Sequence, residues 1–131
     1  MQQVLRNEQD ANDLQFFFND MNFAREAAGS NRDDRTKELY YQGSKNIFER
    51  YAKGSSRGAR RVLAGKRDAA QKRYDNEMKL MQAGRSRYAD EDELMNSSVG
   101  QDLLNARNLT DAVEQTRKGK PYYTRASLRG F

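Results

Sequence analysis

Between its glycines, the chain places apolar side chains at steps of three and four residues, which is the spacing of one face of an α-helix. In the first segment this stripe consists of Leu14, Phe17 or Phe18, Met21, Ala24 and Ala28. Gly29 follows the stripe, at a point where a helix end favours a left-handed residue. The pattern predicts a first helix from about residue 3 to residue 28.

Two more helices are predicted before Gly84. Asp33 or Asp34 can cap a helix that ends at Gly54. Its buried stripe is expected to be Tyr40, Ile47 and Tyr51, with Phe48 alongside. After a short link at 55–58, the longest helix is predicted from about Ala59 to Ala83. One of its faces carries Leu63, Ala70, Tyr74, Met78 and Met81.

The pattern continues more weakly after Gly84. Asp90 and Glu93 have the spacing of a capping box with aspartate in place of Ser or Thr, which predicts a short helix at about 91–97. A fifth helix is expected at about 101–117, before Gly119 and Pro121. Its apolar positions are Leu103, Leu104, Ala106, Leu109, Ala112 and Val113. No stretch alternates with period two, so the predicted fold is all-α with about four to five helices.

The supply of large apolar residues limits how the helices pack. Leu, Ile, Val and Phe number 21 of 131 residues, about 16%, whereas about 20% marks the lower range for independent folding. The charges are mixed and the net charge is only +5, so we expect solvated helices, extended or loosely bundled, that complete their burial on neighbouring subunits. Within one domain we distinguish a helical pair at 1–54, a basic long helix at 55–88, an acidic-capped pair at 89–117 and a docking tail at 118–131.

Positive charge is concentrated in residues 53–87, which carry eleven basic and three acidic side chains for a net charge of +8. The flanking segments carry net charges of −2 and −1. Such a segment favours an anionic neighbour, either DNA, RNA or an acidic protein. The candidate contact residues are Arg57, Arg60, Arg61, Lys66, Arg67, Lys72, Arg73, Arg85 and Arg87.

Helical spacing arranges part of this charge in two rows, Arg60 with Arg67 and Lys66 with Arg73. The rows could follow a phosphate backbone, with bases stacking on Tyr51, Tyr74 and Tyr88. The alternative is a solvated helix face, in which intrahelical pairs such as Asp68–Lys72 and Asp75–Lys79 contribute about 0.2–0.5 kcal/mol each. No zinc-finger, homeodomain or RNP signature is present, so sequence-specific recognition is not expected.

Aromatic residues suggest protein contacts. Phe16, Phe17, Phe18 and Phe23 cover more than one face of the first helix, so they form either a wide core face or a seam between subunits. The tail at 118–131 contains four basic residues, three aromatic residues and no acid. It has the character of an extended peptide that docks in a groove, the alternative being a disordered end. Its candidate anchors are Tyr122, Tyr123 and Phe131.

Residue types argue against catalysis. The chain has no histidine and no cysteine, which removes the commonest general base, the thiol nucleophile and the usual transition-metal ligands. The acids at 90–93 point in different directions around a helix, so helix capping explains them better than Mg²⁺ binding does. Neither 54–58 nor 65–67 matches a phosphate-binding loop. We expect no enzyme activity, no cofactor, no metal and no small-molecule substrate.

The sequence also bears on location. No apolar run approaches the length of about 20 residues that spans a bilayer. The first eight residues have neither a basic opening nor an apolar core, so we expect no signal peptide. The predicted location is the cytoplasm or a virion.

A Gln/Asn-rich opening, a cysteine-free helical body, an Arg-rich middle and an aromatic tail together resemble the small helical virion proteins of tailed phages. These are the internal or ejection proteins and the tail-assembly components. The resemblance lies in composition, and it implies a structural role beside packaged DNA or within a portal and tail assembly, with many copies in a ring or sheath. Because no long apolar or Gly/Ala-rich stretch is present, it does not extend to a membrane-crossing channel.

We therefore expect a non-enzymatic, all-helical assembly protein that contacts other subunits as a homo- or hetero-oligomer. Nucleic acid is a possible second partner. The alternatives are an autonomous basic helical domain that binds nucleic acid nonspecifically and an adaptor or inhibitor that presents its basic segment to an acidic protein.

Overall fold

The computed structural model describes residues 2–28 and 33–120, and this part of the chain contains five helices and no strand. The all-α prediction is therefore confirmed. The helices are α1 (Gln2–Ala28), α2 (Asp34–Gly54), α3 (Arg57–Gln82), α4 (Glu91–Asn96) and α5 (Ser98–Arg117). None of the described helices is both long enough and apolar enough to cross a membrane.

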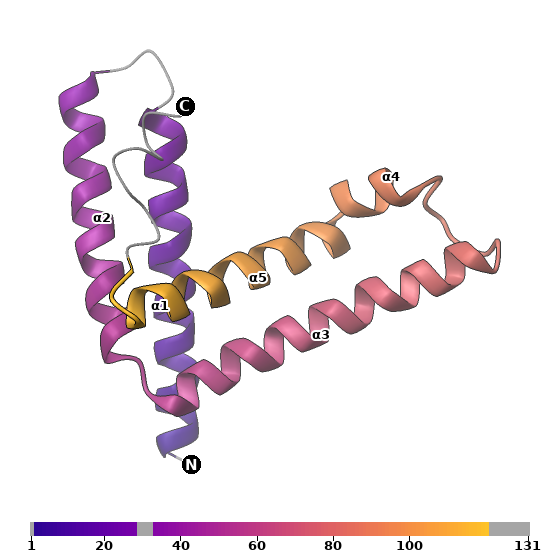
Figure 1. Cartoon of the computed structure of the whole chain (residues 1–131), viewed down its shortest axis with the longest axis horizontal. Coiled ribbons are helices and arrows are strands. Elements are labelled where there is room, and N and C mark those ends of the chain that lie inside the picture. Colours follow the sequence, from indigo (N-terminus) through magenta and orange to yellow (C-terminus); the bar gives the residue numbers. More distant parts are fainter. Residues whose placement is uncertain (1, 29–32, 121–131) are drawn as a thin grey trace.

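The helices form two antiparallel pairs that meet at an angle (Figure 1). Helices α1 and α2 lie side by side as the α1–α2 hairpin. Helices α3 and α5 extend away from the hairpin as the α3–α5 arm, and α4 lies at its far end (Figure 1). The arm is joined to the hairpin where α3 packs on α1 and where α5 packs on α2.

Local signals set the helix ends. The Asp33 carboxylate accepts a hydrogen bond from the Arg35 N–H at 3.1 Å, and the Ser56 hydroxyl accepts from the Ala59 N–H at 3.0 Å, so each caps the following helix. Gly84 and Gly119 have φ angles of 72° and 76°, the left-handed conformation that ends α3 and α5. Gly29, the predicted end of the first helix, lies outside the described residues, as does the side chain of Ala28.

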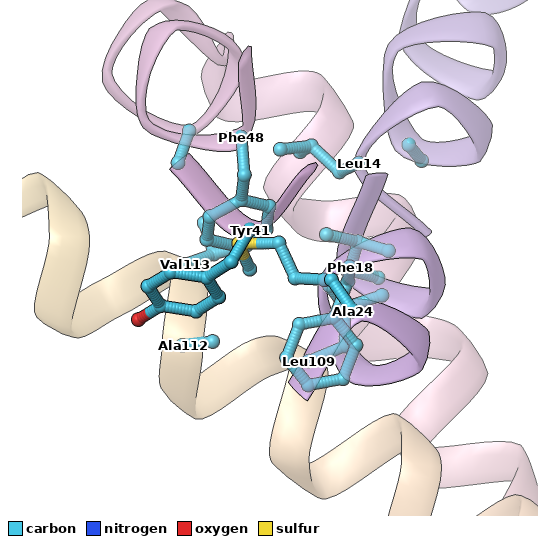
Figure 2. Close-up of a cluster of buried hydrophobic side chains, with 12 residues drawn as sticks. Leu14, Phe18, Ala24, Tyr41, Phe48, Leu109, Ala112 and Val113 are labelled. Atoms are coloured by element: carbon cyan, nitrogen blue, oxygen red, sulfur yellow. The ribbon is translucent and has the colours of Figure 1, made fainter. Parts of the chain in front are cut away.

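The larger core lies where the hairpin meets the arm, and four helices contribute to it (Figure 2). Its buried members are Ala11, Leu14, Phe18, Met21, Ala24, Tyr41, Phe48, Ala52, Leu63, Leu109, Ala112 and Val113. A second cluster fills the far end of the arm and consists of Ala70, Tyr74, Leu94, Val99 and Leu103. The chain thus divides its few apolar residues between two small cores.

The predicted buried stripe of α2 is wrong by one residue. Phe48 is buried as expected, but Tyr40, Ile47 and Tyr51 are 44%, 39% and 37% exposed. The buried row of α2 is instead Lys37, Tyr41, Ser44, Phe48 and Ala52. A pattern of apolar residues missed this row because Ser44, a polar residue, occupies a core position and donates its hydroxyl to Asp20 at 2.9 Å.

Two glycines allow close helix approaches. A Cβ atom at Gly58 would lie 2.0 Å from the side-chain nitrogen of Asn7, where the start of α3 crosses α1. A Cβ atom at Gly100 would lie 2.2 Å from the Met95 carbonyl oxygen, where α4 packs on α5. Both glycines lie inside their helices, and α3 and α5 begin two and three residues earlier than predicted.

Candidate functional site

The two basic rows of α3 exist, but they flank a buried seam. The buried residues of α3 are Ala59, Leu63, Ala70 and Tyr74. Arg60 and Arg67 lie along one side of this seam, and Lys66 and Arg73 lie along the other. Both rows therefore run along the edges where α3 meets its neighbours.

Acids of α5 pair with three of these bases. Arg60 lies 4.0 Å from Glu114, Arg67 lies 3.3 Å from Asp111, and Arg73 lies 3.3 Å from Asp102. The Asp111 and Asp102 side chains are more than half exposed, so each pair contributes only about 0–1 kcal/mol. They connect α3 and α5 at three places along the arm.

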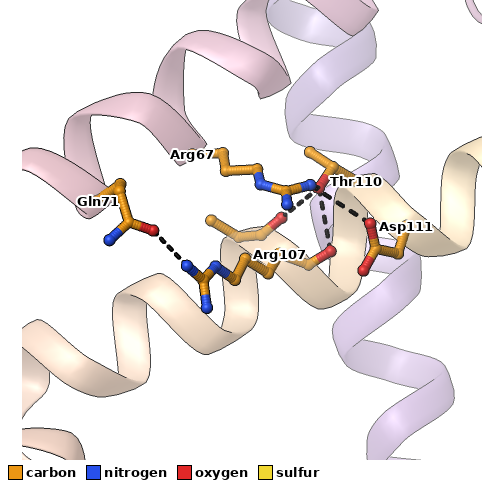
Figure 3. A network of polar contacts seen from close by, with 6 residues as sticks. Arg67, Gln71, Arg107, Thr110 and Asp111 are labelled. Carbon is orange, nitrogen blue, oxygen red and sulfur yellow. Dashed lines mark hydrogen bonds and ion pairs between the residues drawn. The ribbon is translucent and has the colours of Figure 1, made fainter.

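Uncharged groups complete this polar contact between α3 and α5 (Figure 3). Arg67 donates to the Thr110 hydroxyl at 2.9 Å, and Arg107 donates in the opposite direction to Gln71. On the other edge, Lys66 donates to Asn12 of α1 at 3.3 Å. Four of the nine candidate anion-binding residues thus form polar contacts with another helix of the same chain.

The other five candidates divide further. Arg87 lies 3.7 Å from Glu77, and its guanidinium lies 5.7 Å from the centre of the Tyr88 ring. The remaining four candidates, Arg57, Arg61, Lys72 and Arg85, are exposed and form no ion pair within the part of the chain that the structure describes. Of the nine candidates, these four are the ones still available to an external anion.

The alternative interpretation of α3 as a face of intrahelical ion pairs is wrong for the two pairs named. Among the described residues, neither Asp68–Lys72 nor Asp75–Lys79 comes within ion-pair distance. Asp75 instead accepts a hydrogen bond from Gln71 at 2.9 Å. Exposed Asp68 and Asp75 lie on the same outer face as Lys72, so that face has mixed charge.

The tyrosines proposed to stack on bases have other surroundings. Tyr74 is 8% exposed in the second core, and its hydroxyl donates to Glu91 at 3.2 Å. Burial, followed by this hydrogen bond, raises the pKa of Tyr74. The Tyr51 ring packs on Phe17 at 4.8 Å, and Tyr88 is half-buried beside Arg87. Tyr74 therefore has no ring face to offer to a base.

The acids at 90–93 serve the start of α4, as predicted. Asp90 accepts from the Glu93 N–H at 2.9 Å, and Glu93 in turn accepts from the Ala89 N–H at 2.9 Å. The second bond goes to the residue before the cap rather than to the cap itself, so the motif is a shifted capping box. Within the described ranges, no cluster of three acids is arranged to hold a metal ion.

A surface of exposed apolar side chains covers one side of the hairpin, and we call it the aromatic surface. It consists of Phe16, Phe23, Tyr40, Ile47 and Tyr51, which are 65%, 62%, 44%, 39% and 37% exposed. The Phe23 and Tyr40 rings lie 6.2 Å apart between α1 and α2. Half-buried Phe17 touches both Phe16, at 5.4 Å, and Tyr51.

The four phenylalanines predicted to form a core face or a seam thus divide. Phe18 belongs to the core and Phe17 to its edge, whereas Phe16 and Phe23 face outward. Sequence reasoning missed Tyr40, Ile47 and Tyr51 as members of the outward surface because it assigned them to the core. Their spacing of seven and four residues was the available signal, since it places all three on one face of α2.

One carboxylate, Asp20, lies within this surface. It accepts hydrogen bonds from the Tyr40 hydroxyl and from Ser44, one on each oxygen. The Tyr40 hydrogen bond to Asp20, together with partial burial and the carboxylate charge, raises the pKa of Tyr40. Because both of its oxygens have donors from α2, Asp20 links the two helices.

The predicted tail anchors Tyr122, Tyr123 and Phe131 lie outside the described residues. No protein-family model, curated protein or solved structure matches this chain. The described geometry is therefore the basis for any functional proposal.

Proposed function

We propose that this chain is a non-enzymatic structural subunit that acts by protein–protein contact through the α1–α2 hairpin. The observation that carries the proposal is the aromatic surface. With about 200 Å² for a fully exposed aromatic side chain, the five exposed fractions correspond to roughly 500 Å² of apolar surface. Contiguous apolar patches of about 300–600 Å² are the largest on typical monomers and often mark interaction sites.

The placement of the large apolar residues supports the same proposal. The chain has few large apolar residues, yet it leaves two phenylalanines, two tyrosines and an isoleucine exposed on one side. Aromatic residues on a surface are typical anchors of protein interfaces. A role among other subunits of a virion, with packaged DNA nearby, fits the compositional resemblance and is part of this proposal.

Site-specific photocrosslinking tests the proposal in the cells that produce the protein. A photoreactive phenylalanine analogue at Phe23 should give a discrete protein adduct on irradiation, because this exposed ring would face the partner. The matched control carries the analogue at Asn76, an exposed residue of α3 away from the aromatic surface, and should give none. Equal adducts at both positions, or none at Phe23, would contradict the proposal.

Nonspecific nucleic-acid binding is the second candidate, favoured by Arg57, Arg61, Lys72 and Arg85, four exposed candidates that form no ion pair with the described residues. Titration with a random DNA duplex over a range of salt concentrations tests it. Binding through several phosphates predicts that affinity falls steeply with salt, and that Arg57→Ala and Arg61→Ala weaken it evenly across sequences. Arg67→Ala is the control, because Arg67 is held by Thr110 and Asp111.

A further inference from the structure

The exposed side of α1 carries a continuous stripe without charge. Its members follow each other at alternating steps of four and three residues, the spacing of a coiled-coil seam. They are Leu5, Gln9, Asn12, Phe16, Asn19 and Phe23. All six are exposed, and the three apolar ones are 62–65% exposed. The next step of three residues reaches Glu26, so the uncharged stripe ends at Phe23, and it faces away from the buried row of α1.

The stripe is nearly palindromic about position 14. If a second α1 lay antiparallel on it, with a twofold axis at the level of Leu14, the facing residues would have numbers that add up to 28. Leu5 would then face Phe23 of the second copy, and Gln9 would face Asn19. Apolar side chains therefore meet apolar side chains and amides meet amides at the outer positions, and Asn12 faces Phe16 beside the axis. A twofold contact requires this self-complementarity.

Hydrogen bonds within α1 leave the facing amides complementary. The Gln9 amide nitrogen donates to Asp13 at 2.9 Å, so the Gln9 oxygen remains as an acceptor. The Asn19 oxygen accepts from Gln15 at 2.9 Å, so the Asn19 nitrogen remains as a donor. In the twofold arrangement, Asn19 of each copy can donate to Gln9 of the other. Polar amides in such seams specify register and partner orientation.

The area is that of a modest interface. The stripe from Leu5 to Phe23 is about 27 Å long, and two helices side by side are about 20 Å wide, which gives roughly 500 Å² per copy. The total of about 1,000 Å² lies at the lower limit for specific interfaces. We therefore expect a dissociation constant of micromolar order, so that a single pair is reversible.

We propose that the occupant of this stripe is a second copy of this chain, packed antiparallel about a twofold axis at the level of Leu14. The proposal rests on the proposed function and names the partner. From Leu5 to Phe23 the stripe has no charged side chain of its own, and Lys66 of α3 reaches it only at Asn12. A second copy supplies a matching row of apolar groups and amides.

Disulfide trapping tests both the partner and the register, because the chain has no cysteine of its own. Gln9→Cys and Asn19→Cys chains, mixed in equal amounts and oxidised mildly, should form a dimer linked between positions 9 and 19. Each variant alone should not, because its two copies would place the thiols about 15 Å apart along the helix axis, beyond the Cα–Cα reach of a disulfide of about 7 Å. All the substituted side chains are exposed, so folding should be unaffected.

Leu39→Cys, mixed with Gln9→Cys, is the matched control, because Leu39 is exposed on another face of the hairpin. Equal linking in this control, linking of either single variant alone, or no linking in the mixture would overturn the twofold arrangement. If the mixture fails to link while the analogue at Phe23 still captures a protein in cells, the partner is a different protein and the proposed function stands. If both experiments fail, both proposals fall.

Discussion

Gly65 and Gly100 both lie inside helices of the arm, yet their surroundings predict opposite effects of alanine. Nothing lies within 4 Å of a Cβ atom at Gly65, whereas one at Gly100 would meet the Met95 backbone. Gly65→Ala should raise the free energy of unfolding by about 0.5–1 kcal/mol, because alanine loses less backbone entropy. Gly100→Ala should lower it by about 2–3 kcal/mol through overpacking. Urea unfolding of the two variants checks this, and equal effects would contradict it.

Three tyrosines make stability sensitive to alkaline pH. The pKa values of Tyr40, Tyr41 and Tyr74 are raised, Tyr40 mainly by its hydrogen bond to Asp20 and the other two mainly by burial. The native state thus favours neutral phenols. Their contribution is complete below the unfolded pKa of about 10 and is lost as pH rises through the folded values. The urea midpoint should therefore be lower at about pH 11 than at about pH 9, with the loss beginning near pH 10.

The variant Asp20→Asn isolates Tyr40 in that titration, because it removes the negative charge that the phenol faces. The pKa of Tyr40 should fall towards its ordinary value, so part of the tyrosinate absorbance should appear at lower pH than in the wild type. Identical absorbance titrations for the two proteins would show that Asp20 does not act on Tyr40.

At the scale of helices, α5 belongs to two cores, and its leucines should separate them. Leu109 lies in the core that joins hairpin and arm, and Leu103 lies in the core at the end of the arm. Each substitution by alanine should lower the free energy of unfolding of its own core by about 2–5 kcal/mol. In hydrogen exchange, Leu103→Ala should speed exchange in α4 and leave α1 unchanged, whereas Leu109→Ala should speed exchange in α1 and leave α4 unchanged. Uniform acceleration by both variants would mean that the two cores unfold as one.

For the whole molecule, the helices could be predicted from sequence to within three residues at each described end, because caps and glycines are local signals. The contacts of the basic residues could not be predicted from the sequence. Arg67 and Arg73 pair with Asp111 and Asp102, which lie far away in the sequence and do not share a face of α5. The exposure of Tyr40 was missed for a similar reason, since the hydroxyl of Ser44 takes the core position beside it. Both features depend on tertiary contacts.

The central claim is that the exposed side of the hairpin binds a second copy, and sedimentation equilibrium tests it most directly. Between about 1 and 200 µM, the average mass of the wild type should rise from one chain towards two. Phe16→Lys should stay monomeric, because it places a charge in the stripe, whereas Leu39→Lys, at a residue 66% exposed, should behave as the wild type. A wild-type chain that remains monomeric throughout this range, or equal effects of the two substitutions, would contradict the claim.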